Sequence, residues 1–180
     1  MSQFRVFLFF TVCAAMLAVS VASAANRKDL ARVKDTSKIG GCIRCDLSGA
    51  DLENGFFQLA VLIEANLSDA KLDGANLAGA NLTGADLRRA TFHYANLSGA
   101  RMEGADLRGA DFSRAWLNWA WFSGTKLDGA NFKNAYMIGA QLQGADLSKV
   151  LGLTKAQLET ACGDSQTKLP PGIIAPRCPF

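Results

Sequence analysis

Cysteine is the residue type in this chain with the clearest capacity for chemistry. The 180 residues include five cysteines, of which Cys13 lies in an apolar N-terminal run. The other four, Cys42, Cys45, Cys162 and Cys178, form an even set, which in an oxidising compartment is typical of two disulfides. The Cys42-x-x-Cys45 spacing also occurs in redox proteins, but no βαβ pattern accompanies it here, so a structural bridge is the preferred interpretation.

Other side chains offer little support for catalysis. The single histidine, His93, stands beside Tyr94 at an outward turn position, where a solvated side chain is the commoner outcome. No motif supplies a nucleophile with a base and an orienting group, a phosphate-binding loop or a zinc-ligand spacing. We therefore predict a protein that is not an enzyme and that binds no cofactor and no metal.

A five-residue repeat determines where these side chains can lie. Stepping by five from Leu47 to Leu147 meets 21 large apolar residues without a break, and the residue two positions before each is alanine in 18 cases. Residues two apart in an extended segment point the same way, so both face inward, and the residue between them, usually Asp or Asn, faces out. Because a period of five fits neither helix nor strand, the repeat predicts an all-β solenoid.

The remaining two residues of each repeat must turn the chain. The second of them is glycine in 11 of the 21 repeats, which favours a turn with a positive φ at that residue. Bulky residues at this position predict a different turn type: Arg89, Tyr94, Arg114 and Trp119. If each corner is about square, four repeats close a coil of about 20 residues, so that residues 45–149 make about five coils with a stacked length of roughly 25 Å.

The pattern Ala-(Asp/Asn)-Leu-x-x, seen for example in Ala75-Asn76-Leu77, resembles the pentapeptide-repeat family. The resemblance covers residues 45–149 and implies a right-handed quadrilateral β-helix. Some members of that family mimic duplex DNA, bind DNA topoisomerases and confer quinolone resistance, but those members are cytoplasmic, acidic and dimeric. The cysteine-bearing tail of this chain is similar to one on some exported members.

Four segments are expected along the chain. Residues 1–24 carry one positive charge, an apolar run and the small-residue pattern Ala22-Ser23-Ala24, which predict a secretory signal peptide and a periplasmic or secreted protein. Residues 25–44 form an N-terminal cap segment and residues 45–149 the repeat array. Residues 150–180 form a C-terminal cap.

Both caps contain candidate helices. The charged residues 26–38 are compatible with a short one. In the C-terminal segment, Thr154-Lys155-Ala156-Gln157 is a capping-box pattern that predicts a short capping helix over residues 154–162. The prolines that follow exclude helix and predict an extended tail from Leu169 to Pro179.

The solenoid geometry restricts the disulfide pairing. Cys42 and Cys45 take inward positions before the first coil, whereas Cys162 and Cys178 follow the last. A rod of roughly 25 Å separates the two pairs, and a disulfide joins Cα atoms only about 6 Å apart. Cross-pairing and a shared four-cysteine zinc site are therefore excluded, which leaves two local bridges.

Charge argues against a nucleic-acid partner. The chain has 19 basic and 16 acidic residues, and removing Arg5 with the leader leaves 18 against 16, or +2. Such a balance suits neither a strongly acidic mimic of nucleic acid nor a strongly basic binder of it. We expect no nucleic acid, no membrane span after leader removal, and a monomer or weak dimer.

One outward surface departs from the repeat consensus. Trp116 and Trp121 replace the usual Asp or Asn, Trp119 replaces a turn glycine, and Tyr136 stands one predicted coil after Trp116 on the same wall. An exposed aromatic cluster is a candidate contact surface, unless the cap folds back over it. The leading hypothesis is a non-enzymatic exported scaffold that binds a protein or cell-envelope component through its side walls. The alternatives are a topoisomerase-binding DNA mimic and a CxxC redox protein.

Overall fold

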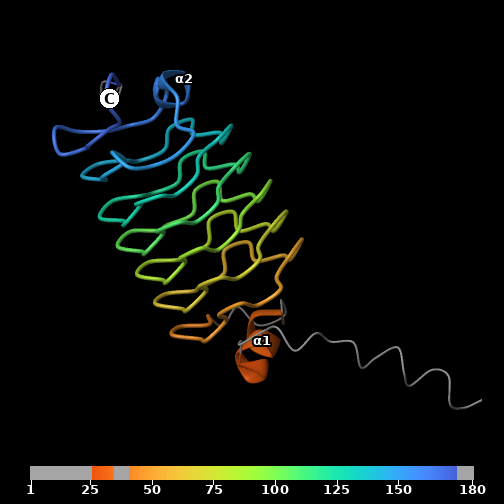
Figure 1. The fold of residues 1–180 in the computed structure, drawn as a ribbon. Helices are drawn as coiled ribbons and strands as arrows, with labels where there is room; N and C mark the ends of the chain where they lie inside the picture. Colours follow the sequence, from red (N-terminus) through yellow and green to blue (C-terminus); the bar gives the residue numbers. More distant parts are fainter. Residues whose placement is uncertain (1–25, 35–40, 174–180) are drawn as a thin grey trace, which may run out of the picture.

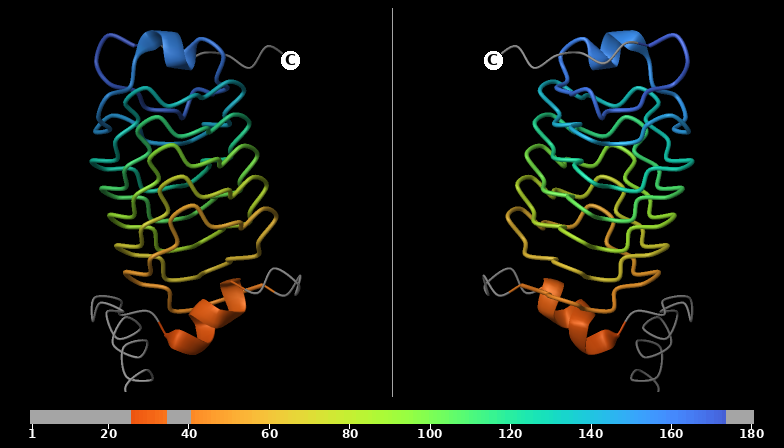
Figure 2. Two further views of the ribbon diagram at one scale, coloured as in Figure 1. Left: turned by 90° about the vertical axis from the view of Figure 1, so that its right-hand side faces the viewer. Right: turned by 90° about the vertical axis from the view of Figure 1, so that its left-hand side faces the viewer.

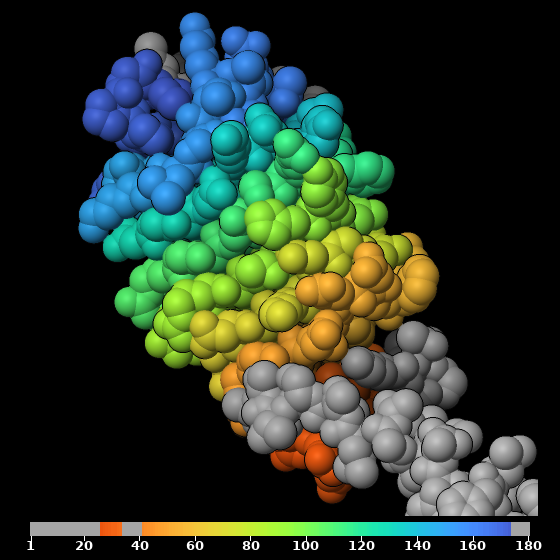
Figure 3. Space-filling view, turned by 45° about the vertical axis from the view of Figure 1, so that its right-hand side comes forward, coloured from red at the N-terminus to blue at the C-terminus, as the bar shows by residue number. Residues whose placement is uncertain are grey.

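The computed structural model describes residues 26–34 and 41–173, so the leader predicted over residues 1–24 and the predicted tail cysteine Cys178 lie outside the described residues. The described chain forms an elongated stack of coils between two short helices, α1 (Arg27–Lys34) and α2 (Lys155–Leu158) (Figure 1). In the space-filling view the coils follow one another as bands of colour along a continuous surface (Figure 3). Neither described helix has the length and apolar character needed to span a bilayer.

Successive coils pair with an offset of four repeats, which confirms the predicted coil length. Outward residues of one coil form parallel bridges with the equivalent residues of the next, beginning with Asp46 and Asn66. Backbone bonds flank each bridge: Leu77 N donates to Asn96 O at 2.7 Å, and Asn96 N donates to Ala75 O at 2.9 Å. The side views show these coils stacked one above the other (Figure 2). The pairs are isolated bridges because a turn interrupts each short extended piece.

The interior is one slender apolar column. All 21 large residues of the array are at most 4% exposed, and Leu77 and Leu97 are fully buried, so the predicted inward register is confirmed. Phenylalanine rings stack along the column, since Phe112 lies 4.9 Å from Phe92 and 5.3 Å from Phe132, centroid to centroid. These three residues occupy equivalent positions in successive coils.

The outward Asp or Asn also stabilises the turn that follows it. Its Oδ1 accepts the backbone N–H two residues later, as Asn76 does from Ala78 at 3.1 Å and Asn96 does from Ser98 at 3.0 Å. The coil-to-coil ladder leaves this N–H without a partner, so a short side-chain acceptor is favoured at the outward position. This explains the consensus better than solubility alone.

The second turn residue has a positive φ at every corner from Gly49 to Gly144, whether or not it is glycine. The glycines there have φ of 62 to 74°, and the four bulky residues that were expected to adopt another turn have φ of 57 to 61°. That expectation, for Arg89, Tyr94, Arg114 and Trp119, is wrong. The ladders above and below impose one backbone shape on every corner, although a left-handed conformation costs a non-glycine residue about 1–2 kcal/mol.

Strained corners are paired across adjacent coils. Three stacked pairs have complementary side chains: Arg44 with Glu64, Asp69 with Arg89, and Tyr94 with Arg114. Arg89 donates to both carboxylate oxygens of Asp69 at 2.6 Å. Side-chain contacts between coils therefore offset part of the backbone cost at these corners.

Helix α1 covers the first coil. Leu30 and Val33 pack against the core, and Asn26 Oδ1 accepts the Lys28 N–H at 3.0 Å at the start of the helix. Beneath it, Cys42 and Cys45 are each 2% exposed and form a disulfide with a Cα–Cα distance of 5.2 Å. The local bridge was predicted from the sequence, and α1 lies within residues 26–38, which are compatible with a short helix.

The ladder continues beyond residue 149, with a wider register. Leu151 pairs with Asn131 at the usual offset, but Cys162 pairs with Gln141 and Lys168 with Asp146. The offset thus widens by one residue at the first of these two pairs and by one more at the second. Helix α2 occupies the chain between Leu151 and Cys162. Cys162 N donates to Ala140 O at 2.8 Å, so the backbone must be extended again by that residue.

This return to the ladder corrects the predicted helix over residues 154–162. Helix α2 ends at Leu158, although the capping box at its start is present: Thr154 N donates to Gln157 Oε1 at 2.9 Å, and Gln157 N donates to Thr154 Oγ1 at 3.4 Å. The Gln157 amide also donates to Phe132 O and Ala135 O, which anchors the helix to the corner between these two residues.

The predicted extended tail is wrong for its described part. Ile173 N donates to Pro170 O at 3.2 Å, and Gly172 has a φ of 86°. Proline followed by glycine favours a β-turn, because Pro171 restricts its own φ and glycine accepts the positive value. The rest of the predicted tail lies outside the described residues.

Truncating a core phenylalanine should be far more destabilising than truncating a surface one. Phe112→Ala is expected to lower the free energy of unfolding by about 3–5 kcal/mol, because it opens a cavity between two stacked rings. Phe56→Ala is the matched control, since Phe56 is 75% exposed, and should change stability by less than about 0.5 kcal/mol. Urea unfolding followed by circular dichroism measures both. Equal losses would contradict the inward register.

Charge pairs along the wall should make the fold less stable in acid. The Arg108 guanidinium donates to both carboxylate oxygens of Asp106, and this hydrogen bonding lowers the pKa of Asp106 below its ordinary value. Since the folded pKa is the lower one, the contribution is complete above the unfolded pKa, near 4, and is lost as pH falls through the folded pKa. Asp106→Asn retains an acceptor for the Arg108 N–H but removes the charge. The variant should therefore lose less stability than the parent between pH 7 and about pH 2.5 in urea titrations; an equal loss would exclude this pair as a source.

Candidate functional site

The aromatic surface comprises Trp116, Trp119, Trp121, Tyr136 and Ile138, near the C-terminal end of the stack. Their exposed fractions lie between 46% and 56%. Trp116 forms a bridge with Tyr136, one coil further on, and Trp121 lies on the next wall. The register thus places Trp116 and Tyr136 side by side, whereas Trp119 stands at the following corner and Trp121 on the wall beyond it. Ile138 was missed; its position, one coil after Asn118 and close to Tyr136, is the signal that could have located it.

Trp119 leans toward the neighbouring coil. A Cβ built on Gly139 would lie 2.4 to 2.7 Å from three atoms of the Trp119 indole, and Gly139 is buried although it sits at a corner. By contrast, a Cβ on Gly99, one coil before Trp119, would meet nothing within 4 Å. Gly139 therefore leaves the space that the indole fills.

Two of the tryptophans remove a local hydrogen bond. Trp116 and Trp121 stand where Asp or Asn would accept the N–H two residues later, so the N–H groups of Asn118 and Ser123 have no acceptor among the described residues. A net contribution of about 1 kcal/mol for each bond is lost in this way. Local stability thus does not explain tryptophan at these positions.

A groove of about 670 Å³ borders the aromatic surface. It lies between one corner column, the wall that carries Trp116 and Tyr136, and helix α2. Its lining includes the polar side chains of Tyr94, Arg114, Asn134, Thr154, Gln157 and Thr160. No acidic residue lines it.

Arg114 is the positively charged side chain in the lining of this groove. Its Nη1 donates to the Tyr94 hydroxyl, and its Cζ lies 5.4 Å from the centroid of the Tyr94 ring. The other arginines between residues 41 and 173 each pair with a carboxylate: Arg44, Arg88, Arg89, Arg101 and Arg108. Arg114 has no carboxylate partner among the described residues, so its charge is available to a ligand.

His93 has neighbours that sequence spacing alone did not reveal. Its Nδ1 lies 2.6 Å from Ser113 Oγ, and its Nε2 lies 3.5 Å from Asp111 Oδ2. Ser113 follows His93 by one coil, so the coil offset is the signal that could have found it. The order serine, histidine, carboxylate is that of a hydrolytic triad, but the N–H groups of Ser113 and Arg114 already donate to other acceptors. This leaves no pair of adjacent donors at Ser113 to stabilise an oxyanion.

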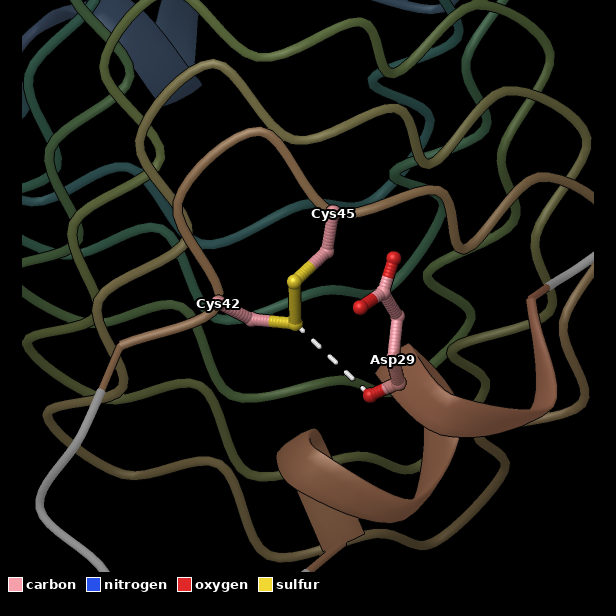
Figure 4. Close-up of side chains that lie close together, drawn as sticks. All are labelled: Asp29, Cys42 and Cys45. Carbon is pink, nitrogen blue, oxygen red and sulfur yellow. Dashed lines mark hydrogen bonds between the residues drawn. A yellow bond between two sulfur atoms is a disulfide. The ribbon is translucent and has the colours of Figure 1, made fainter.

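The N-terminal cysteines lie close to a carboxylate. Asp29, Cys42 and Cys45 offer ligand atoms within 4.8 Å of one another, and the Cys42 Sγ lies 3.7 Å from Asp29 O (Figure 4). Metal ligation by cysteine requires thiolates, whereas both sulfurs here are joined in a disulfide. Asp29 Oδ2 accepts the Asp46 N–H at 3.1 Å. Asp29, Cys42 and Cys45 thus serve a structural role, with the disulfide buried beneath α1.

At the other end, Cys162 is 5% exposed and disulfide-bonded. Its predicted partner, Cys178, lies outside the described residues. The pairing of these two cysteines therefore stays a prediction.

Glycine-to-alanine substitutions at Gly99 and Gly139 should test where the Trp119 ring lies. Gly99→Ala is expected to cost about 1–2 kcal/mol of unfolding free energy through its positive φ alone. Gly139→Ala has the same φ penalty and a clash with the indole, so it should cost more. In the Trp119→Ala background the two glycine substitutions should cost the same, as measured by urea unfolding. A persistent difference in that background would contradict the placement of the ring.

The repeat array matches a family model described as pentapeptide repeats, in overlapping segments that extend from residue 42 to residue 151. No curated protein matches the chain. Among solved structures, it is similar to a pentapeptide repeat protein of the cyanobacterium Cyanothece 51142, with 34% identity over 53% of this chain and 62% of that one and a TM-score of 0.47.

Two further structures are similar at lower TM-scores. HetL of Nostoc sp. strain PCC 7120, involved in the regulation of heterocyst differentiation, has 30% identity over 68% of this chain and 65% of its own, with a TM-score of 0.38. A protein of the Arabidopsis thaliana thylakoid lumen has 31% identity over 67% and 82%, also with a TM-score of 0.38. The chain thus spans less than two thirds of the first two structures. On the family match, which covers more than half of its length, the chain belongs to the pentapeptide repeat family, whose members form right-handed quadrilateral β-helices.

Proposed function

We propose that this protein is a non-enzymatic exported scaffold that binds a protein or cell-envelope component through the aromatic surface. The solenoid, about five coils closed by α2, would hold that surface rigid. The observation that carries the proposal is the exposure of Trp116, Trp119 and Trp121 where the repeat favours Asp, Asn or glycine. Exposed aromatic clusters that do not serve local stability are typical of contact surfaces.

Two features support export to the periplasm or beyond. Residues 1–24 have the composition of a cleaved leader. The Cys42–Cys45 disulfide, buried beneath α1, suits an oxidising compartment.

The two alternative functions have less support. A DNA mimic needs a continuous acidic surface, whereas the carboxylates of Asp69, Asp86 and Asp106 are each paired with an arginine. A CxxC redox protein needs an accessible sulfur, whereas Cys42 and Cys45 are each 2% exposed.

Replacing the three tryptophans by alanine should abolish partner capture while the fold is retained. The triple variant Trp116→Ala, Trp119→Ala, Trp121→Ala and the parent would be immobilised and exposed to envelope extract of the source cells. Phe56→Ala is the matched control, because Phe56 is exposed on the wall of Trp116 three coils away. We expect the parent and the control to retain the same components and the triple variant to retain none of them. If a triple variant with an unchanged circular dichroism spectrum retains them all, the proposal is wrong.

A further inference from the structure

We infer that the groove beside the aromatic surface recognises an acidic oligosaccharide, with a sugar carboxylate on Arg114 and sugar rings against Trp116 and Tyr136. This inference rests on the proposed binding function and specifies the chemistry of the ligand. It follows from the charge, the free polar groups and the backbone bonding of the groove.

Charge complementarity indicates an anion. Arg114 is the single charged residue in the groove lining, and no described carboxylate neutralises it. Tyr94 holds the guanidinium by a hydroxyl acceptor and by its ring face, so the side chain is oriented before a ligand arrives. A guanidinium is suited to a planar carboxylate because it offers parallel N–H donors.

Two polar side chains of the groove lining, those of Asn134 and Thr160, are left over by the hydrogen bonding of the described residues. Neither the side-chain amide of Asn134 nor the hydroxyl of Thr160 makes a hydrogen bond among the described residues. Both can exchange donor and acceptor bonds with hydroxyl groups. The exposed rings of Trp116 and Tyr136, on adjacent coils, offer a flat apolar platform for the C–H faces of sugar rings.

An extended peptide is a poorer occupant of this wall. Peptides that add to a sheet do so through free main-chain groups, but here those groups are consumed by the coil ladder. Trp116 N donates to Ala95 O at 2.9 Å, and Leu117 N donates to Tyr136 O at 2.8 Å. The wall must therefore bind through side chains, which suits a hydroxyl-rich ligand.

A single-stranded nucleic acid is also disfavoured. Its bases could stack on the aromatic rings, but a series of cations along the phosphate backbone is normally required. The groove lining offers one. One carboxylate for several sugar rings is the closer match.

Titration with defined oligosaccharides tests the inference. The full processed protein would be titrated with sialyllactose, which has one carboxylate on three sugar rings, with neutral maltotriose of the same length and with a single-stranded oligonucleotide, using tryptophan fluorescence and calorimetry. We expect binding of the acidic trisaccharide, weakened by salt, and no detectable binding of the other two. Equal affinity for the neutral sugar, tighter binding of the oligonucleotide, or no binding of sialyllactose would overturn the inference.

A matched pair of variants tests whether Arg114 binds the sugar carboxylate. Arg114→Gly and Arg89→Gly both replace an arginine by glycine at a corner with positive φ, a conformation that glycine accepts, so neither should misfold. Arg114→Gly should weaken sialyllactose binding roughly ten- to a hundredfold, as expected for a charge-assisted pair. Arg89→Gly, at another corner and paired with Asp69, should leave it unchanged. Equal effects of the two variants would overturn the inference.

Failure of this inference is distinguishable from failure of the proposed function. If the tryptophan variants lose their envelope partners while sialyllactose does not bind, the aromatic surface binds something else and only the ligand class is wrong. If sialyllactose binds in an Arg114-dependent way while envelope capture is insensitive to the tryptophans, the groove inference stands and the proposed function is wrong.

Discussion

Backbone hydrogen bonds between successive coils impose one shape on every coil of this protein. Each extended piece donates to and accepts from the coils on both sides, with an offset of four repeats that widens only after Leu151. Every coil must therefore follow the same path, and every corner must carry the same left-handed residue. This is why Trp119 and Arg114 adopt a φ near 60° that glycine would accept at lower cost.

The same ladder makes residues one coil apart in the sequence neighbours on the surface. Each wall or corner is therefore a column to which every coil contributes one residue at the equivalent position. Tyr94 with Arg114 and Trp116 with Tyr136 are two such pairs, and together they border the groove. A binding surface on this fold needs no loop insertion, because replacing consensus residues at equivalent positions is sufficient.

Consensus residues and functional residues compete for the same outward positions. An Asn such as Asn96 closes its own turn, whereas Trp116 leaves the corresponding N–H without an acceptor among the described residues and presents its ring instead. The buried column tolerates this loss because its stability comes from core packing and coil stacking. The wall can therefore vary while the interior stays regular.

The features that depend on the periodic backbone hydrogen bonds could be predicted from residue spacing. The contacts that individual side chains make at the repeat positions could not. The inward positions of Leu77 and Leu97, the coil of four repeats and the Cys42–Cys45 bridge follow from spacing, because a five-residue period admits one arrangement of facing side chains. The length of α2, by contrast, is set by the need of Cys162 to rejoin the ladder. The contact of Trp119 with Gly139, that of His93 with Ser113 and the availability of Arg114 depend on rotamers and on partners in other coils. These side-chain contacts join residues in different coils, so no local sequence pattern predicts them. The backbone register, by contrast, repeats along the chain and can therefore be read from the sequence.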